Sequence, residues 1–311
     1  MKLIDLNVGD DVEGFYLLKS AALKKANNGK PYLSCALCDN SDTVDAKVWD
    51  YAGPLSSADE GKVVKIRAQV TEYKGTKQLN IYRIREAQEG DLFSLTELVP
   101  SAPIDAGDAM ARLLGYIASM QDEDYRSVCR EIIERNRARF ETIPAAKTVH
   151  HSFLHGLLMH TVYMADTASF LASRYKEVLN RDLLLAGTIL HDIAKLREFS
   201  TSGLGLVTEY SFSGQMLGHL VMGAQEVARV CEEQGVSEEK AVLLQHMLLS
   251  HHGEPEFGAA VVPKCAEAEL LYYIDCIDSR MEIYRETLDK IDPGTFSDRV
   301  FALDKKIYKP L

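Results

Sequence analysis

The sequence lacks the features of a secreted or membrane-anchored protein. No apolar run approaches the roughly 20 residues that cross a bilayer, and residues 1–5 contain no apolar signal core. Cysteines are few, and those at positions 35, 38, 129, 231, 265 and 276 are too scattered for a disulfide framework. We therefore expect a cytoplasmic protein with reduced thiols and no membrane partner.

Positive charge is also scarce. The chain has 35 Lys and Arg residues against 46 Asp and Glu residues, which gives a net charge of −11. Residues 1–90 contain 13 of each kind, so the acidic excess belongs to the remainder of the chain. A strongly basic surface would indicate tight, nonspecific binding of nucleic acid. Without one, a polyanionic partner has to be held by local clusters of cations or by metal ions.

Residues 1–88 have the pattern of a small β-barrel. Short turn sequences separate five apolar or alternating segments, which cover residues 12–23, 31–39, 43–50, 62–73 and 77–84. Residues 54–58 add a short helix or loop between the third and fourth segments. This order resembles the five-stranded OB-fold barrel, whose open face commonly takes single-stranded nucleic acid.

Aromatic and basic residues are interleaved in this part of the chain. Together they can stack bases and hold phosphates, and the candidates are Lys24, Lys25, Lys30, Tyr32, Trp49, Lys74 and Lys77. Each also has a purely structural interpretation, because alternation buries half of the rings and loop lysines are normally solvated.

A helical region follows a predicted linker over residues 89–105, where Pro100 and Pro103 interrupt any helix. From Ala106 the apolar spacing is that of helices. We predict an all-α domain over residues 106–295 and a C-terminal tail over residues 296–311. The tail can pack on a second copy of the chain, so a homo-oligomer is one expectation.

The helical region is organised around the run Gly187-Thr188-Ile189-Leu190-His191-Asp192-Ile193-Ala194-Lys195. Adjacent imidazole and carboxylate groups can reach one divalent cation, and the preceding apolar residues would bury their helix. Two residues do not complete a coordination sphere. Further candidate ligands lie in other segments, at His160, His219, His251, His252 and Asp275.

These candidates divide into two sets. His160, His191, Asp192 and Asp275 form a mixed imidazole and carboxylate site, which suits manganese, iron, zinc or nickel better than calcium. His219 and the His251-His252 pair can hold a second ion that Asp192 bridges to the first. The order of these residues along the chain resembles the HD-domain superfamily of metal-dependent phosphohydrolases in its two-metal form.

With the barrel, the segment 147–161 and the closing segment 296–304, nearly the whole chain resembles the YhaM-type 3′-to-5′ exoribonucleases of bacteria. The resemblance implies that His160, His191, Asp192 and Asp275 hold one metal and that His219 and His251 hold another, with His252 able to replace His251. Lys195 would contact the substrate phosphate, although a lysine near a helix end also has an ordinary structural role. His151, His155 and Arg280 are weaker candidates for metal or phosphate contact, and His155 stands where the family has a small residue.

The resemblance further implies hydrolysis of single-stranded RNA to nucleoside 5′-monophosphates with two divalent ions, manganese favoured and iron, zinc, nickel or magnesium open. Single-stranded DNA is a further candidate substrate. Three alternatives stay open: a phosphohydrolase of small nucleotides or cyclic dinucleotides, a non-catalytic nucleic-acid-binding regulator, and a di-iron oxygenase. No Walker-type loop is present, and Gly203, Gly205 and Gly214 indicate a loop over residues 200–214 that is a lid or a plain connection.

Overall fold

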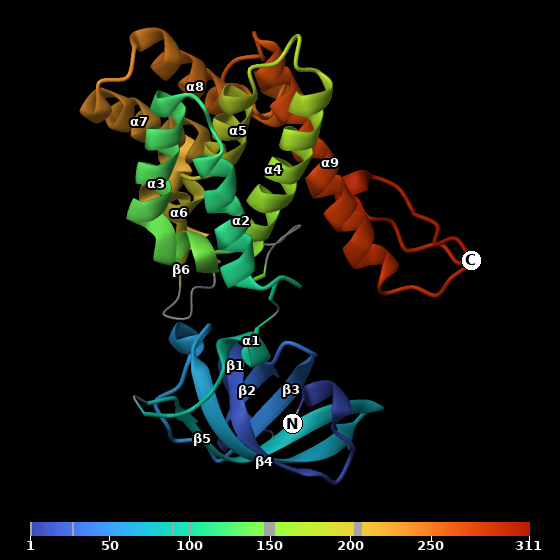
Figure 1. The fold of residues 1–311 in the computed structure, drawn as a ribbon. Helices are drawn as coiled ribbons and strands as arrows, with labels where there is room; N and C mark the ends of the chain where they lie inside the picture. Colours follow the sequence, from blue (N-terminus) through green and yellow to red (C-terminus); the bar gives the residue numbers. More distant parts are fainter. Residues whose placement is uncertain (1, 27, 89, 100, 146–152, 202–206) are drawn as a thin grey trace. The chain divides into compact units, whose positions relative to one another are not determined.

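The chain forms two compact units, the first comprising Met1–Ser101 with Thr201–Thr208 and the second Ala102–Ser200 with Glu209–Leu311. The structure, a computed structural model, describes residues 2–26, 28–88, 90–99, 101–145, 153–201 and 207–311 (Figure 1). Among them, no helix is both long enough and apolar enough to span a bilayer. A β-barrel followed by helices confirms the predicted fold class.

The first unit is a closed five-stranded barrel. Its strands pair in the order β1-β2-β3-β5-β4, and their bounds are β1 (Asp11–Lys25), β2 (Pro31–Cys38), β3 (Thr43–Trp49), β4 (Val63–Tyr73) and β5 (Thr76–Glu86). β3 and β5 are parallel, and the other neighbours are antiparallel. A short 3-10 turn, η2 (Ser57–Asp59), lies between β3 and β4, where the sequence predicts a helix or loop.

Alternation along the strands fills the barrel interior. Leu33, Leu37 and Leu79 are fully buried, whereas Trp49 and Tyr82 are 49% and 59% exposed. Burial of a Leu side chain contributes about 1.5–3 kcal/mol, so a shift of one residue in register would be costly. The CxxC cysteines belong to this structural set, since burial raises the pKa of Cys35 to about 12.

Part of the predicted linker is packed rather than free. A short helix, α1 (Leu95–Leu98), occurs within it, and Leu98 and Val99 are buried. The backbone N–H of Asn40 donates a hydrogen bond to the Glu97 carbonyl over 3.0 Å. These contacts attach this segment to the first unit.

The second unit is helical, apart from its parts of the strands β6 (Phe199–Thr201) and β7 (Val207–Tyr210). Its helices are α2 (Ala106–Ala118), α3 (Glu123–Thr142), α4 (Gly156–Arg174), α5 (Arg181–Leu190), α6 (Lys195–Glu198), α7 (Phe212–Gln234), α8 (Glu238–Ser250) and α9 (Ala266–Leu288). Side chains that accept backbone N–H bonds begin several of them, among them Asp105, Asp122, Asn180 and Ser211.

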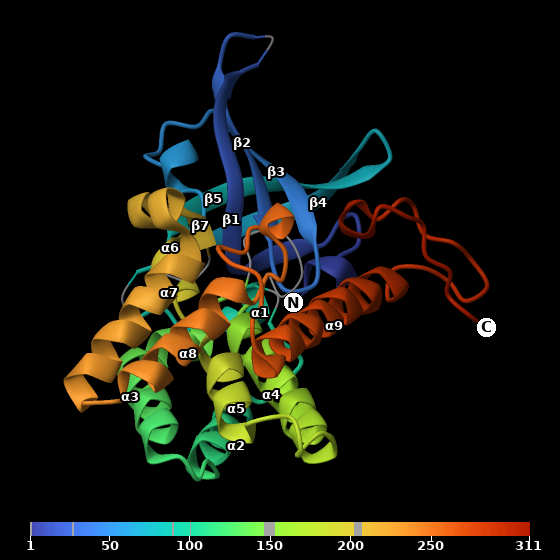
Figure 2. The ribbon, with the colours of Figure 1, turned by 90° about the horizontal axis from the view of Figure 1, so that it is seen from above.

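α5 lies at the centre of this unit and packs against α2, α3, α4, α8 and α9 (Figures 1 and 2). Every residue from Asp182 to Leu190 is buried. Gly187 sets the close approach of α5 to α8, because a Cβ there would lie 2.5 Å from Met247 Cε and 3.0 Å from its Cβ. The central helix therefore holds the end that carries the His-Asp pair in a fixed position.

Residues 200–201 and 207–214, the described part of this segment, do not form the single loop that the glycines indicate. β6 and β7 pair as a two-stranded sheet, and Gly214 lies inside α7, where an added Cβ would collide with the Glu198 carbonyl oxygen. Gly203 and Gly205 lie outside the described residues. Gly214 therefore serves the packing of α6 against α7 rather than a loop.

The C-terminal segment folds back beside the end of α9 (Figures 1 and 2). Single bridges join Phe296 to Tyr308 and Val300 to Lys305. Ile307 and Leu303 are buried with Ile283 of α9. The segment thus has a place on its own chain, and packing on a second copy stays a prediction.

Candidate active site

The His-Asp pair lies at the end of a helix and not inside one. α5 ends at Leu190, His191 is its C-cap, and a turn leads to Lys195, where α6 begins. The His191 Nδ1–H donates to the Thr188 carbonyl over 2.8 Å, an oxygen that the helix end leaves without a helical partner. The side chain of His191 therefore takes part in ending α5.

Four imidazoles around the His-Asp pair have the same pattern of hydrogen bonding. In each, Nδ1 bonds to an oxygen that only accepts, which leaves the lone pair on Nε2. The acceptors are Asp278 Oδ2 for His160 at 2.6 Å, Thr188 O for His191 at 2.8 Å, Glu198 Oε1 for His219 at 3.0 Å, and Leu248 O for His251 at 2.8 Å. All four rings are therefore set to bind a cation through Nε2.

The first set of predicted ligands comes together around His160 on α4. Its Nε2 lies 3.3 Å from His191 Nε2 and 3.4 Å from Asp275 Oδ1 of α9. His191 Nε2 lies 3.2 Å from Asp192 Oδ2. These ligand atoms come from α4, from α9 and from the turn that follows α5, and they meet in one buried place, as a metal site requires.

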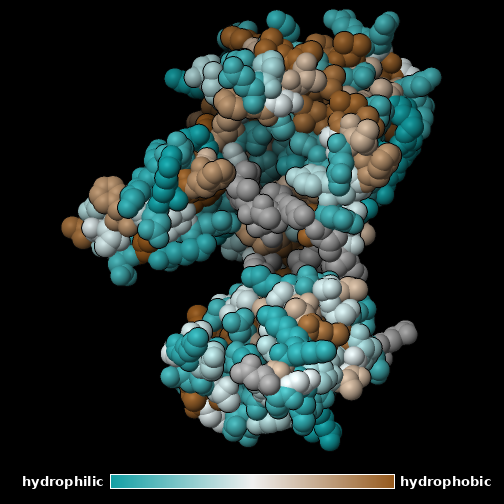
Figure 3. All heavy atoms as spheres, turned by 180° about the vertical axis from the view of Figure 1, so that it is seen from behind, coloured by the Kyte–Doolittle hydropathy of each residue, from teal (hydrophilic) through white to brown (hydrophobic). Residues whose placement is uncertain are grey.

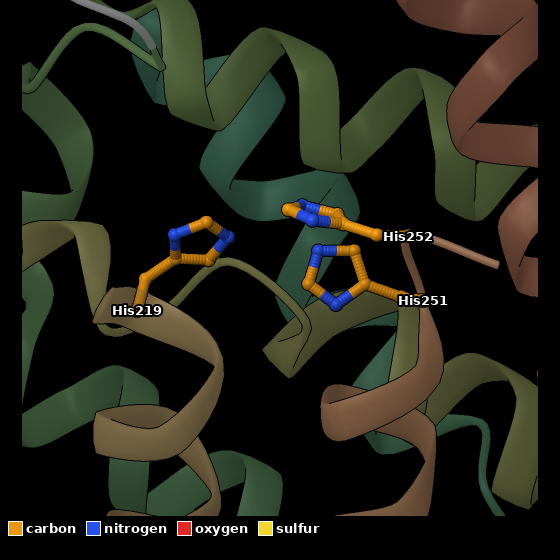
Figure 4. Close-up of side chains that lie close together, drawn as sticks. All are labelled: His219, His251 and His252. Atoms are coloured by element: carbon orange, nitrogen blue, oxygen red, sulfur yellow. The ribbon is translucent and has the colours of Figure 1, made fainter. Parts of the chain in front are cut away.

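The second set faces the other oxygen of Asp192. His219 Nε2 lies 3.4 Å from Asp192 Oδ1, and His251 Nε2 lies 3.8 Å from it. Figure 4 shows His219 on one helix turned towards His251 and His252 at the end of another. Because its two oxygens face different sets of imidazoles, Asp192 has the geometry that a bridging carboxylate needs.

Three buried polar atoms at this junction have no hydrogen-bond partner among the described residues: Asp192 Oδ1, His219 Nε2 and His252 Nδ1. Burying such an atom without a partner costs about 1–3 kcal/mol each. A divalent cation would compensate that cost, so the donor set fits a metal better than a packed protein interior.

Protonation in the cluster also suits a metal. Burial alone would raise the pKa of Asp192, but Lys195 and His191 outweigh it and hold that pKa well below its usual range. Burial, with His191 nearby, holds the pKa of His251 well below its usual value, and burial lowers that of His252. An ionised carboxylate thus lies beside the neutral imidazoles of His251 and His252, the forms that coordinate cations.

The two aspartates of α9 have different positions. Asp275 Oδ1 lies on the Nε2 side of His160, and Asp278 Oδ2 lies behind the ring, at Nδ1. Burial alone would lower the pKa of His160, but hydrogen bonds with both carboxylates raise it to about 10. Asp275 is therefore placed as a ligand would be, and Asp278 as the residue that orients one.

Lys195 contacts the carboxylate of the His-Asp pair. Its Nζ lies 2.6 Å from Asp192 Oδ2, and its side chain is 17% exposed. Burial would lower the pKa of Lys195, but Asp192 raises it above its usual value, so the ammonium stays charged. The structure thus places Lys195 at the site, in contact with a predicted ligand.

Glu198 is a functional residue that the sequence reasoning missed. It is 6% exposed, and its Oε1 accepts hydrogen bonds from both the backbone N–H and the Nδ1–H of His219, each over 3.0 Å. Gly218, which precedes His219, has φ of +70° and breaks the helical path of α7. The available signal was an acidic residue three positions after Lys195, which places both on one side of α6.

The three weaker candidates in the helical unit are His151, His155 and Arg280. His155 has φ of +63°, and its ring is hydrogen-bonded to the Glu141 carbonyl. Among the described residues, it belongs to none of the groups that could hold a metal ion. His151 lies outside the described residues. Arg280 lines a pocket of ≈ 340 Å³ together with His251 and Asp275.

On the barrel, aromatic rings and lysine side chains form a second group. Tyr32 and Trp49 have ring centroids 4.9 Å apart, and the Lys47 ammonium lies 5.4 Å from the Trp49 ring and 4.9 Å from that of Tyr73. Lys74 lies 5.5 Å from the Tyr73 ring as well. The sequence candidates thus form part of an aromatic and basic surface, which we call the Trp49 surface.

The other predicted lysines have contacts of their own. Lys30 pairs with Asp50 over 3.0 Å, and the Lys77 ammonium donates to the Leu6 carbonyl. Lys24 and Lys25 are exposed at the end of β1. Figure 3 shows one face of the barrel covered largely by hydrophilic residues. A pocket of ≈ 590 Å³, lined in part by Trp49 and Arg83, adjoins the Trp49 surface.

Comparison with known proteins agrees with this arrangement. Residues 157–280 match the family model described as HD domain, and this range contains all members of the two predicted ligand sets. The fold and the site thus define an HD-domain protein with an N-terminal barrel. The chain is 37% identical over 315 residues to the 3′-5′ exoribonuclease YhaM of Geobacillus sp. (strain WCH70), covering 99% of this chain and 95% of that protein. The chain belongs to the YhaM family of 3′-5′ exoribonucleases.

Two solved structures with OB folds are also similar. The second OB-fold domain of replication protein A from Methanococcus maripaludis is 14% identical, with a TM-score of 0.23, and the match covers 30% of this chain and 98% of that one. An OB domain from Thermoplasma acidophilum is 16% identical, with a TM-score of 0.23, and the match covers 30% and 91%.

Proposed function

We propose that the chain is a metal-dependent exoribonuclease that removes nucleoside 5′-monophosphates one at a time from the 3′ end of single-stranded RNA. One observation carries the proposal: the Asp192 carboxylate lies between two sets of imidazoles, with Oδ2 facing His191 and the unpartnered Oδ1 facing His219 and His251. Membership of the exoribonuclease family supports the direction and the substrate.

The proposed metal ligands are those that the sequence predicts. His160, His191, Asp192 and Asp275 would hold one divalent ion, and His219 and His251 would hold a second that Asp192 bridges. His252 completes the second set, because one of its ring nitrogens lies within 4.8 Å of a ring nitrogen of His219 and of His251. Manganese is our preferred metal, since mixed imidazole and carboxylate sites accept it and the family resemblance favours it.

The protein's own groups prepare this chemistry. When bound, two divalent ions would lower the pKa of a water nucleophile and offset charge on the phosphate. Asp278 and Glu198 hold His160 and His219 in the orientation that presents Nε2. Lys195, charged and 2.6 Å from Asp192 Oδ2, can turn to the substrate phosphate once a cation shares that carboxylate.

We further propose that residues 1–88 bind RNA and residues 106–295 cleave it. The Trp49 surface supports this division, because its rings can stack bases and Lys47 and Lys74 can pair with phosphates. Stacking on a ring is not specific to ribose, so the same surface would accept single-stranded DNA. Homo-oligomers are a separate expectation that this proposal does not need.

The test is a time course on a 5′-labelled single-stranded RNA with added manganese, comparing wild type with Asp192→Asn. Wild type should produce a ladder that shortens from the 3′ end, and the isosteric variant should leave the RNA intact. Intact RNA with both proteins would overturn the proposal and direct the search to small nucleotides or cyclic dinucleotides as substrates.

A further inference from the structure

The pocket of ≈ 340 Å³ beside the cluster is lined in part by residues that metal binding does not use. Its lining includes His251, His252 and Asp275 of the cluster, and also Phe257, Tyr272 and Arg280. Its volume falls in the range of about 300–1,000 Å³ that small-molecule sites occupy. A molecule in this pocket would therefore lie directly against the metal centre.

The ring of Tyr272 is held in place by the chain that follows the two histidines. A Cβ on Gly253 would lie 2.6 Å from Tyr272 Cε2, so the ring rests against bare backbone. Gly253 also has φ of +76°, which disfavours any other residue. This packing fixes an aromatic side chain of α9 beside His252.

Phe257 provides an exposed ring on a fixed turn. It ends the 3-10 helix η3 (Pro255–Phe257) and is 65% exposed, although it lines the pocket. The turn is closed by hydrogen bonds from Gly258 N–H to the Pro255 carbonyl at 3.0 Å and from Ala260 N–H to the Leu249 carbonyl at 3.0 Å. A large apolar ring that the fold leaves exposed on a fixed turn is suited to stacking against a flat ligand.

Arg280 adds a cation to the same pocket. Within the described part of the chain, no hydrogen bond or ion pair engages its guanidinium, in contrast to Arg285 one turn further along α9, which pairs with Glu282. An unpaired guanidinium close to Asp275 is available to an incoming phosphate. Aromatic rings, a cation and a metal centre are the groups that a nucleotide needs.

We propose that this pocket binds the 3′-terminal nucleotide of the RNA, with its base stacked on Phe257 and Tyr272 and its phosphate between Arg280 and the metal centre. The inference rests on the proposed function, because the terminal nucleotide is the unit that an exonuclease of this direction releases. Phe257 and Tyr272 then set how well a 3′ end is held, and they contact the base without reading its hydrogen-bonding edge. The four ordinary bases should be removed at similar rates.

The sharpest test removes the base and the ring separately. Two RNAs of equal length, one ending in adenosine and one in an abasic ribose, are compared for kcat/KM of the first cleavage. Wild type should cleave the abasic end about tenfold more slowly, the size of one stacking contact. Phe257→Ala should be slower on the RNA that ends in adenosine, so that the ratio of the two rates falls towards one. Phe170→Ala removes a ring that is 68% exposed on α4 and serves as the matched control, with the wild-type ratio retained.

A binding measurement separates this inference from the proposed function. Metal-loaded wild type should bind adenosine 5′-monophosphate about tenfold more tightly than ribose 5-phosphate in calorimetry, and Phe257→Ala should lose most of this difference. Tyr272→Leu, which keeps an apolar side chain against Gly253, should give a smaller change in the same direction. If wild type cleaves RNA but its preference for a terminal base survives in Phe257→Ala, the pocket assignment is wrong. If wild type cleaves no RNA yet prefers adenosine 5′-monophosphate through Phe257, the exoribonuclease function fails and the nucleotide pocket stands.

Discussion

The two candidate regions of this protein are built in opposite ways. In the His-Asp cluster, His160, His191 and His251 are 3%, 0% and 1% exposed, and an acceptor oxygen fixes each ring. On the Trp49 surface, Trp49 and Tyr73 are 49% and 55% exposed, and the Lys47 ammonium lies over both rings. Catalysis needs atoms held in one geometry, whereas binding a flexible strand tolerates movable groups.

The contrast predicts that variants in the cluster affect every substrate, while variants on the barrel affect only substrates long enough to reach it. It also predicts that replacing the hydrogen-bond partner of a side chain lowers activity more in the cluster than on the barrel. A buried ring that loses its partner has no water nearby to form the hydrogen bond instead. Each variant below tests one side of this contrast.

The largest effect should come from Asp192→Asn. This carboxylate faces both sets of imidazoles, so the variant should lose both metal binding and turnover. Its kcat should fall by about a thousandfold or more, because a bound metal contributes several kcal/mol to the stability of the transition state. Metal content by mass spectrometry and cleavage of RNA measure the two losses. Asp304→Asn, which changes an exposed acid of the C-terminal segment, is the control. Full turnover by Asp192→Asn would remove the cluster from the mechanism.

Glu198→Gln should have the next largest effect. Gln keeps the shape but weakens the two bonds to His219, and loss of such a supporting contact typically costs about 10–100-fold in metal affinity or activity. Titration with manganese measures the affinity directly. Glu226→Gln is matched to it, because Glu226 is also buried, at 8%, but pairs with Arg197 rather than with an imidazole. Equal losses in the two variants would show that Glu198 acts through general stability.

Trp49→Ala should act on RNA binding alone. Removing this ring should weaken the affinity for single-stranded RNA by about tenfold, as expected for one base stack. Fluorescence anisotropy in an Asp192→Asn background measures binding without cleavage. Tyr175→Ala, which removes a ring 52% exposed in the helical unit, should leave the affinity unchanged. Unchanged affinity with Trp49→Ala would mean that RNA passes elsewhere on the barrel.

The smallest effects distinguish two lysines that look alike in the sequence. Lys74→Ala should weaken RNA binding about two- to threefold and reduce the salt slope by about one, the signature of one lost phosphate contact. Lys77→Ala should leave RNA binding unchanged, because the ammonium is bonded to the Leu6 carbonyl, and should lower stability by about 1 kcal/mol. Salt titrations and urea unfolding separate the two outcomes.

The strands and helices could largely be predicted from apolar spacing, because burial itself produces that spacing. The pattern of His160, the His-Asp pair, His219 and the two later histidines could also be found, since few residue types coordinate metals. Two kinds of feature could not be found in this way. The end of α5 at Leu190 depends on one bond from a side chain to the backbone, which leaves no periodic signal.

Supporting residues form the second kind. Glu198 and Asp278 resemble ordinary helix acids until the fold places them behind His219 and His160. In the same way, Lys77 resembles Lys74 until the Leu6 carbonyl is seen to engage it. Residue type limits what a side chain can do, but the contact that decides its role comes from segments far away in the sequence.

The most direct test of the division between the two regions is the ratio of kcat/KM on a long single-stranded RNA to kcat/KM on a dinucleotide. We predict that Trp49→Ala lowers this ratio by about tenfold, because only the long RNA reaches the barrel, whereas Glu198→Gln lowers both rates and leaves the ratio at its wild-type value. A Trp49→Ala enzyme with the wild-type ratio, or a Glu198→Gln enzyme impaired on the long RNA alone, would contradict the division.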